Sequence, residues 1–175
     1  MMRCLALALV ATAAIAAEQP DLKGLRAGMS EQELLAAMPT LRCRTPPVAM
    51  GDRICSDGKN TLVGQPAILS VTLINDRTAR IIFFFAADHA NEVADAITKK
   101  YGEPSGSTSL PTRSSSGIEL TRKLTTWNVG DESQVELSHL PGTDRGTWLN
   151  LTDKTGRNEV IMRMKQEKDR KAKDL

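Results

Sequence analysis

The first seventeen residues constrain this chain more than any other stretch of it. They open on Met1, Met2 and Arg3, continue through an apolar run at 5–10, and close on small residues at 13–17. A positive start, a short apolar core and small residues before a cleavage point are typical of a secretory signal peptide. The apolar run is about half of the ~20 residues that a membrane-spanning helix needs. We therefore expect export, with no transmembrane segment in the mature chain.

Export predicts the state of the cysteines. Cys4 leaves with the signal peptide, and the mature chain keeps Cys43 and Cys55, twelve positions apart. In an oxidising compartment two such cysteines are expected to form a disulfide. A redox pair or a metal site is the alternative, but the spacing is not that of a CxxC motif and no histidine lies near either thiol. We predict a structural disulfide in a bacterial protein that is periplasmic or secreted.

Three segments of different character divide the chain. We expect residues 1–17 to be the signal peptide, residues 18–153 to form one α+β domain, and residues 154–175 to form a charged C-terminal helix or tail. The last segment carries eight basic and four acidic residues. Its stretch 157–173 lacks glycine and proline and is rich in helix-forming residues, which predicts a helix with an exposed end.

Capping residues and hydrophobic periodicity predict the elements of the domain. Ser30, with Glu33 three residues later, forms a capping box at the start of a helix that Pro39 ends. Asp88 predicts the cap of a second helix, which ends at Gly102. Residues 105–117 are dense in serine and glycine and predict a mobile loop. Apolar runs predict strands at 60–63, 67–74, 80–86, 118–129, 133–140 and 147–151.

This order of elements predicts the α+β class, with an antiparallel sheet packed by helices and an extra helix at the C-terminus. The pattern of a helix followed by three strands occurs twice, which suggests two tandem αβββ units. The sequence shows no residue-level repeat that would establish a duplication. The run at 80–86 is apolar on both faces of a strand and predicts a central position in the sheet.

Two short motifs resemble a known family. Residues Gly24–Glu31, followed by an apolar helix, resemble the start of the BamE/SmpA outer-membrane-assembly lipoproteins and related small secreted bacterial proteins. Residues Ile97–Pro104 resemble the helix ending common in the same group. The layout is also similar to that of the beta-lactamase-inhibitor protein. The resemblance implies a periplasmic protein that binds other proteins and performs no chemistry. No lipobox cysteine follows the signal peptide, so the resemblance does not extend to a lipid anchor.

Composition disfavours several classes of function. The formal net charge is +2 and aromatic residues make up 3% of the chain. A general nucleic-acid binder needs a basic excess and often aromatic stacking residues, so we expect no nucleic-acid partner. The sequence lacks a glycine-rich phosphate loop after a strand, and we expect no cofactor.

Candidate catalytic residues are few. The two histidines, His89 and His139, have no second ligand or nucleophile in register, so we predict neither a metal site nor a catalytic triad. Glu119 and Glu136 could face each other on adjacent strands, as the carboxylates of a glycoside hydrolase do. Surface charge is the ordinary alternative for both, and we predict that the protein is not an enzyme.

Two tryptophans are the candidate partner-binding residues. Trp127 and Trp148 lie in the second group of strands, at positions that could share one face of the sheet. An exposed pair would be a hot spot for binding a protein. Alternatively, both pack against the second helix and fill the core, which is the more common fate of aromatic side chains.

The leading hypothesis is therefore a non-enzymatic binding module of the cell envelope, an accessory or inhibitor protein with an unknown protein partner. It would present its sheet face or the 105–117 loop. Two alternatives remain open. One is a small hydrolase that uses the carboxylates named above. The other is a carrier of a small ligand or lipid, whose pocket would be built from residues 81–85 and 135–137.

Overall fold

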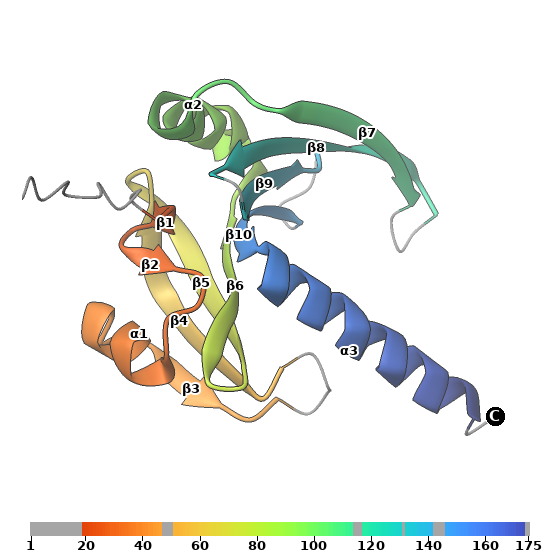
Figure 1. The fold of residues 1–175 in the computed structure, drawn as a ribbon. Coiled ribbons are helices and arrows are strands. Elements are labelled where there is room, and N and C mark those ends of the chain that lie inside the picture. Colours follow the sequence, from red (N-terminus) through yellow and green to blue (C-terminus); the bar gives the residue numbers. More distant parts are fainter. Residues whose placement is uncertain (1–18, 47–50, 114–116, 131, 142–145, 174–175) are drawn as a thin grey trace, which may run out of the picture.

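The computed structural model describes residues 19–46, 51–113, 117–130, 132–141 and 146–173, so the predicted signal peptide lies outside the described residues. The fold is mixed α+β, with one eight-stranded sheet, a two-stranded hairpin and three α-helices (Figure 1). The elements are β1 (Asp21–Leu22), β2 (Leu25–Arg26), α1 (Glu31–Ala37), β3 (Arg42–Arg44), β4 (Arg53–Leu62), β5 (Gln65–Ile74), β6 (Arg77–Phe85), the 3-10 helix η1 (Ala87–His89), α2 (Ala90–Tyr101), β7 (Gly106–Arg113), β8 (Glu119–Val129), β9 (Ser133–His139), β10 (Thr147–Asp153) and α3 (Lys154–Lys173).

The large sheet joins two meanders back to back. Its strand order is β3-β4-β5-β6-β10-β9-β8-β7, and all neighbouring strands are antiparallel. The strands β6 and β10 meet at the centre, although α2 and three strands separate them in the sequence. The apolar run at 80–86 is therefore central, as predicted, because both of its faces are covered or partly covered by neighbours.

The predicted class is confirmed, including the antiparallel sheet and the C-terminal helix. The expected units of one helix and three strands are not confirmed, because α1 and α2 are each followed by four strands of the sheet. Two strands account for the difference. The short β3 carried no recognisable pattern. Residues 106–113, predicted as part of a loop, form β7, because pairing of all eight residues with Glu119–Thr126 of β8 outweighs their poor strand composition.

The first helix begins as its capping residues predict. The Ser30 hydroxyl oxygen accepts a hydrogen bond from the Glu33 backbone N–H at 3.3 Å, and the Glu33 carboxylate accepts one from the Ser30 N–H at 2.8 Å. Leu34 is the fully buried residue of this helix. The helix ends at Ala37, two residues before Pro39, since a proline disfavours helical backbone in the residue before it.

The second helix begins one residue later than predicted. Asp88 does not cap it, because residues 87–89 form a 3-10 turn and His89 occupies the N-cap position without a side-chain bond. The predicted apolar stripe is present, with Val93 and Ile97 buried and Tyr101 partly buried. Gly102 ends the helix at a φ of 87°, a left-handed conformation that favours glycine.

The helices α1 and α2 and the β1–β2 hairpin pack on one face of the sheet, which we call the covered face. Side chains alternate across a strand, so every second residue of the central strands enters the core on this side. Fully buried examples are Val71, Phe83 and Leu149. The opposite face carries neither of these helices, and we call it the open face.

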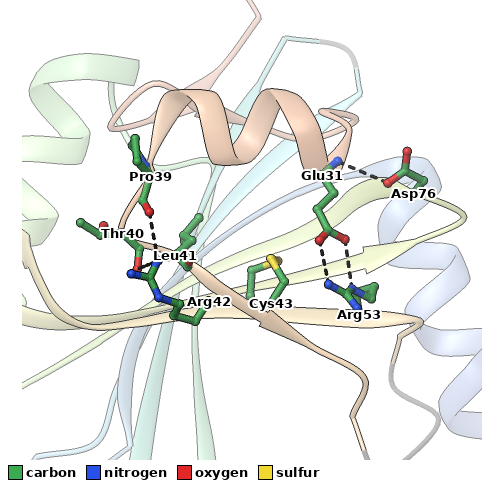
Figure 2. The surroundings of a disulfide bond; sticks show 9 residues. Glu31, Pro39, Thr40, Leu41, Arg42, Cys43, Arg53 and Asp76 are labelled. Atoms are coloured by element: carbon green, nitrogen blue, oxygen red, sulfur yellow. Dashed lines mark hydrogen bonds and ion pairs between the residues drawn. A yellow bond between two sulfur atoms is a disulfide. The ribbon is translucent and has the colours of Figure 1, made fainter.

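A disulfide secures one edge of the sheet. Cys43 of β3 and Cys55 of β4 lie directly opposite each other and are bonded, which confirms the predicted pair (Figure 2). Closing a loop of this length contributes about 3 kcal/mol in the chain-entropy account. Beside it, the Arg53 guanidinium donates two hydrogen bonds to the Glu31 carboxylate at 2.8 and 3.0 Å, which ties β4 to α1.

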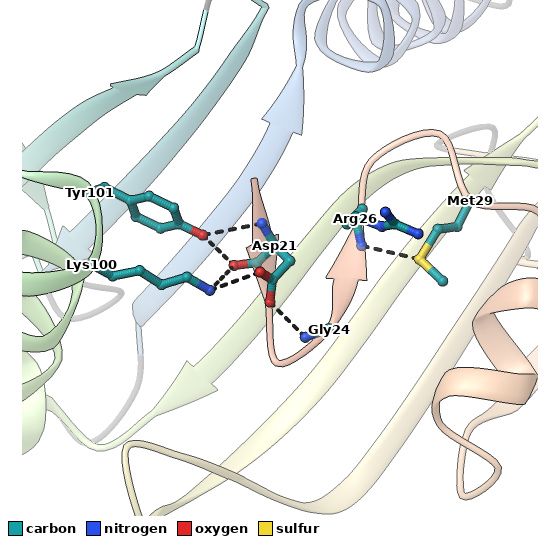
Figure 3. A network of polar contacts seen from close by, with 6 residues as sticks. All are labelled: Asp21, Gly24, Arg26, Met29, Lys100 and Tyr101. Atoms are coloured by element: carbon teal, nitrogen blue, oxygen red, sulfur yellow. Dashed lines mark hydrogen bonds and ion pairs between the residues drawn. The ribbon is translucent and has the colours of Figure 1, made fainter. Parts of the chain in front are cut away.

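A polar network holds the N-terminal hairpin against α2 (Figure 3). The Asp21 carboxylate accepts hydrogen bonds from the Gly24 N–H at 2.7 Å and from the Lys100 ammonium at 2.9 Å. The Tyr101 hydroxyl donates to the Asp21 carbonyl oxygen. Burial opposes ionisation of Asp21, but these hydrogen bonds and the Lys100 charge outweigh it, so the pKa of the carboxyl is lowered.

Replacing Asp21 by Asn tests this network. A carboxyl whose folded pKa lies below its unfolded pKa stabilises the fold above the unfolded value and loses that contribution as pH falls. We expect Asp21→Asn to lower the unfolding free energy by about 1 kcal/mol at pH 7. The difference should shrink as pH falls below the ordinary value of 3.8. Urea denaturation across pH measures this, with Asp95→Asn on the exposed side of α2 as control; a pH-independent difference would contradict it.

The helix α3 starts directly after β10, earlier than the predicted 157, and crosses to the side of the sheet opposite α1 (Figure 1). Arg163 of α3 forms an ion pair with Asp52 at 2.8 Å, whereas Arg53, the next residue, reaches α1. These two ion pairs thus connect neighbouring residues at the start of β4 to helices on opposite sides of the sheet (Figure 1). Within the described residues, no helix has the length and apolar character needed to cross a membrane.

Gly156 is the point where α3 approaches the sheet most closely. A Cβ atom there would lie 2.3 Å from the Ala79 carbonyl oxygen and 2.8 Å from its Cα. Alanine favours a helix over glycine by about 1 kcal/mol, but a clash with backbone costs about 1–3 kcal/mol. The contact should therefore outweigh the helix propensity.

We expect Gly156→Ala to lower the urea midpoint and to loosen the base of α3. Gly58→Ala is the matched control, because a Cβ at Gly58 meets no atom within 4 Å. A Gly156→Ala protein as stable as the wild type would show that α3 does not dock on β6 as described.

Candidate functional site: the open face of the sheet

A row of side chains crosses five strands on the open face. Ile68 of β5 pairs with Phe84 of β6, which pairs with Trp148 of β10. The row continues through Ser138 of β9 to Leu124 of β8. Ile68 is 51% exposed and Phe84 is 39% exposed. Large apolar side chains gathered on an exposed surface mark interaction sites more often than chance exposure does.

The register explains why apolar residues reach both faces of β6. In the run 81–85, Ile81, Phe83 and Phe85 point into the core, and the residues between them point to the open face. Ile82 is nearly covered by its neighbours, while Phe84 is exposed. A strand that needed only a core face would carry polar residues at these alternate positions.

A hollow of about 920 Å³ lies at one end of the row. Ile68 and Phe84 contribute to its wall, together with the irregular part of β4 around Gly58 and Lys59. This size is within the range of protein pockets that hold a small molecule or an anchoring side chain. Its lining residues lie at 58–61, 66–68, 84–86 and 146–147.

Polar residues extend the site along β6 and β10. The Arg80 Nε donates a hydrogen bond to the Asn150 Oδ1 at 3.1 Å, and the Asn150 Nδ2 donates to the Glu136 carboxylate at 3.1 Å. The Arg80 guanidinium carbon lies 5.7 Å from the centre of the Trp148 ring, within the range of a cation–π contact. Burial lowers the pKa of Arg80, and the nearby Glu136 charge opposes that shift.

A second arginine lies at the other end of the row. Arg122 of β8 donates hydrogen bonds to the Ser138 hydroxyl and, at 2.9 Å, to the Gly146 carbonyl oxygen. Ser138 belongs to the row, and Gly146 lines the hollow. The hydrogen bonds hold the start of β10 against β8 and β9, and they place a second positive charge on the open face.

The structure separates the two tryptophans. Trp127 pairs with Val135, which pairs with Leu151, and these three side chains lie in the core on the covered face. Trp127 is 1% exposed, so the prediction of an exposed pair is wrong. Trp148 is partly buried on the open face, so the alternative that both pack under α2 is also wrong. The strand register determines which face of the sheet each tryptophan occupies, and the sequence alone does not determine that register.

The candidate carboxylates are not brought together. Glu136 pairs with Thr126 on β8, and Glu119 lies seven positions before Thr126, an odd offset, so the two glutamates lie on opposite faces. Glu119 is exposed and forms an ion pair with Arg113 at 2.9 Å. The pair proposed from the sequence for a hydrolase is therefore wrong.

The structure also places the two histidines and Ser138, the other residues considered for catalysis or metal binding. His139 is at the end of β9 and Ser138 points to the other face, so the two do not form a catalytic pair. Burial and the charge of Lys123 lower the pKa of His139. His89 lies 3.7 Å from the Glu92 carboxylate at the start of α2. Within the described ranges, no three His, Cys, Asp or Glu residues gather as metal ligands would.

The strands predicted to build a carrier pocket supply the core instead. Ile81, Phe83, Phe85, Val135 and Leu137 are buried beneath the helices of the covered face. The hollow of about 920 Å³ touches only one end of the predicted stretch: Phe84 and Phe85 line it, whereas residues 135–137 do not.

No protein-family model matches this chain, and no curated protein and no solved structure is significantly similar to it. The resemblance to the BamE/SmpA family therefore stays a prediction. What the site does has to be inferred from its own residues.

Sequence reasoning missed Arg80 and Ile68, and it considered Phe84 only as part of the 81–85 wall of a carrier pocket. The sequence did contain an indication. A strand with apolar side chains on both faces must either be covered on both faces or expose the side chains of one face. Without the order of the strands, that indication could not identify which face is exposed.

The exposure of the tryptophans can be measured directly. We expect acrylamide to quench the fluorescence of Trp148 and to leave that of Trp127 largely unaffected. Trp148→Phe should then leave a weakly quenched emission at short wavelength, and Trp127→Phe should leave the strongly quenched one. Equal quenching of the two variants would contradict the assignment of the tryptophans to opposite faces.

Proposed function

We propose that this chain is a non-enzymatic protein-binding module of a bacterial cell envelope, exported to the periplasm or secreted. The signal-peptide pattern at residues 1–17 supports export, and the Cys43–Cys55 disulfide is consistent with an oxidising compartment. The binding surface is the open face of the sheet, rather than the 105–117 segment, most of which belongs to β7.

The exposed row carries this proposal. The core strands bury their apolar residues under α1 and α2, yet Ile68 and Phe84 lie open to solvent next to Trp148. Tryptophan and arginine are the residue types most enriched among interface hot spots, and here Trp148 and Arg80 are in contact. A rigid sheet also presents these side chains with little conformational entropy to lose on binding.

A protein is the partner that suits this surface. The near-neutral chain lacks the basic excess of a nucleic-acid binder. The carboxylate pair on which a hydrolase would depend is split between the two faces, which removes the sequence basis for that alternative. The hollow beside Phe84 is suited to receive one projecting side chain of a partner.

Photocrosslinking in the exporting cell tests the proposal. We expect a photoreactive phenylalanine at position 84 to form an adduct with a protein partner, because Phe84 is an exposed member of the row. The same amino acid at Lys99, on the exposed side of α2, is the matched control. Phe84→Glu should remove an adduct formed from position 68. Equal adducts from positions 84 and 99, or none from either, would contradict the assignment of the open face.

A further inference from the structure

Arg80, on the open face, has donors that the described residues do not use. Among the described residues, Arg80 donates only through Nε, to Asn150, and neither terminal nitrogen has a hydrogen-bond acceptor. The side chain is partly buried, with its guanidinium next to the Trp148 ring. Because Asn150 holds the guanidinium through Nε, the two terminal nitrogens are left to donate paired hydrogen bonds to a planar anion such as a carboxylate.

Charge on this face favours an acidic ligand. Arg80 and Arg122 flank the row, and Lys59 contributes to the wall of the hollow. The one acidic residue of the group is Glu136, and a carboxylate oxygen of it already accepts a hydrogen bond from Asn150. The positive charges therefore outnumber the negative charge around the apolar centre, so an acidic partner is attracted and a basic one is repelled.

We propose, resting on the proposed function, that the open face recognises a protein segment in which an acidic side chain lies close to a large apolar one. The apolar side chain enters the hollow beside Ile68 and Phe84, and the carboxylate pairs with the free side of Arg80. The ligand group is the side chain of Asp or Glu within a chain.

Geometry limits how far apart the two side chains can be. The Arg80 guanidinium carbon lies 5.7 Å from the centre of the Trp148 ring, and Phe84 is the direct neighbour of Trp148. Arg80 and Phe84 are four positions apart on β6, about 13 Å along the strand, and the Arg80 side chain reaches toward Trp148 and so shortens this gap. We therefore expect the acidic residue within three positions of the apolar residue, about 10 Å of extended chain.

Selection from a random-peptide library tests this without knowledge of the partner. The probe is a library of eight-residue segments displayed at the N-terminus of a phage coat protein, which offers no free C-terminal carboxylate. We expect the mature protein to enrich segments with Asp or Glu within three positions of Phe, Leu, Ile, Met or Trp. A selected segment should bind about tenfold more weakly to Arg80→Gln and should weaken with salt.

Three variants separate the explanations. Arg26→Gln removes an exposed arginine of the N-terminal hairpin, away from the row, and should bind as the wild type does. Arg80→Lys keeps the charge without the planar fork and should bind with intermediate affinity. Phe84→Glu should abolish binding. Thermal unfolding of each variant shows that a loss of binding is not a loss of fold.

The outcomes distinguish the two proposals. Enriched segments that are apolar without acidic residues, or an affinity unchanged in Arg80→Gln, would overturn the acidic ligand and leave the open face as the binding surface. Binding only of synthetic peptides with a free C-terminal carboxylate would overturn the assignment to a side chain. Enrichment that is equal on the wild type and on Phe84→Glu would overturn both the ligand and the open face.

Discussion

The pairing of β6 with β10 is the contact on which the rest of the structure depends. It joins two meanders into one sheet of eight strands, although the paired residues are more than 60 positions apart in the sequence. Such a pairing is costly in loop-closure entropy, and it forms because both strands are apolar enough to bury a face. The same register places Phe84 against Trp148, so the central seam of the fold and the centre of the proposed binding surface are one feature.

The sheet that the β6–β10 pairing creates has two different faces. On one side, α1, α2 and the N-terminal hairpin cover the core, and the disulfide and the Asp21 network fix its margins. On the other side, α3 contacts the rest of the fold through its first half, at Gly156, Arg157 and Arg163. Ile68 and Phe84 consequently stay exposed, and Trp148 stays partly exposed. The proposed binding role rests on these exposed apolar side chains.

Features that depend on residues close together in the sequence could be predicted. The capping box at Ser30, the central position of the strand at 80–86 and the Cys43–Cys55 disulfide depend on neighbouring residues or on compartment, and all three are confirmed. The errors share a different cause. The strand at 106–113 and the faces of Trp127 and Glu119 depend on strand order and register, which are set by contacts between distant residues. The candidate site consists of such contacts, so its residues were visible in the sequence but their grouping was not.

The two margins of the sheet differ in a way that affects association with other strands. The margin at β3 is three residues long and cross-linked to its neighbour. The margin at β7 is eight residues long and exposed almost throughout. Pro111 lies within it and has no N–H to offer, so an added strand would lose its ladder of hydrogen bonds part-way along. Pro111 thus disfavours the repeated edge-to-edge addition of strands by which sheets grow into fibres.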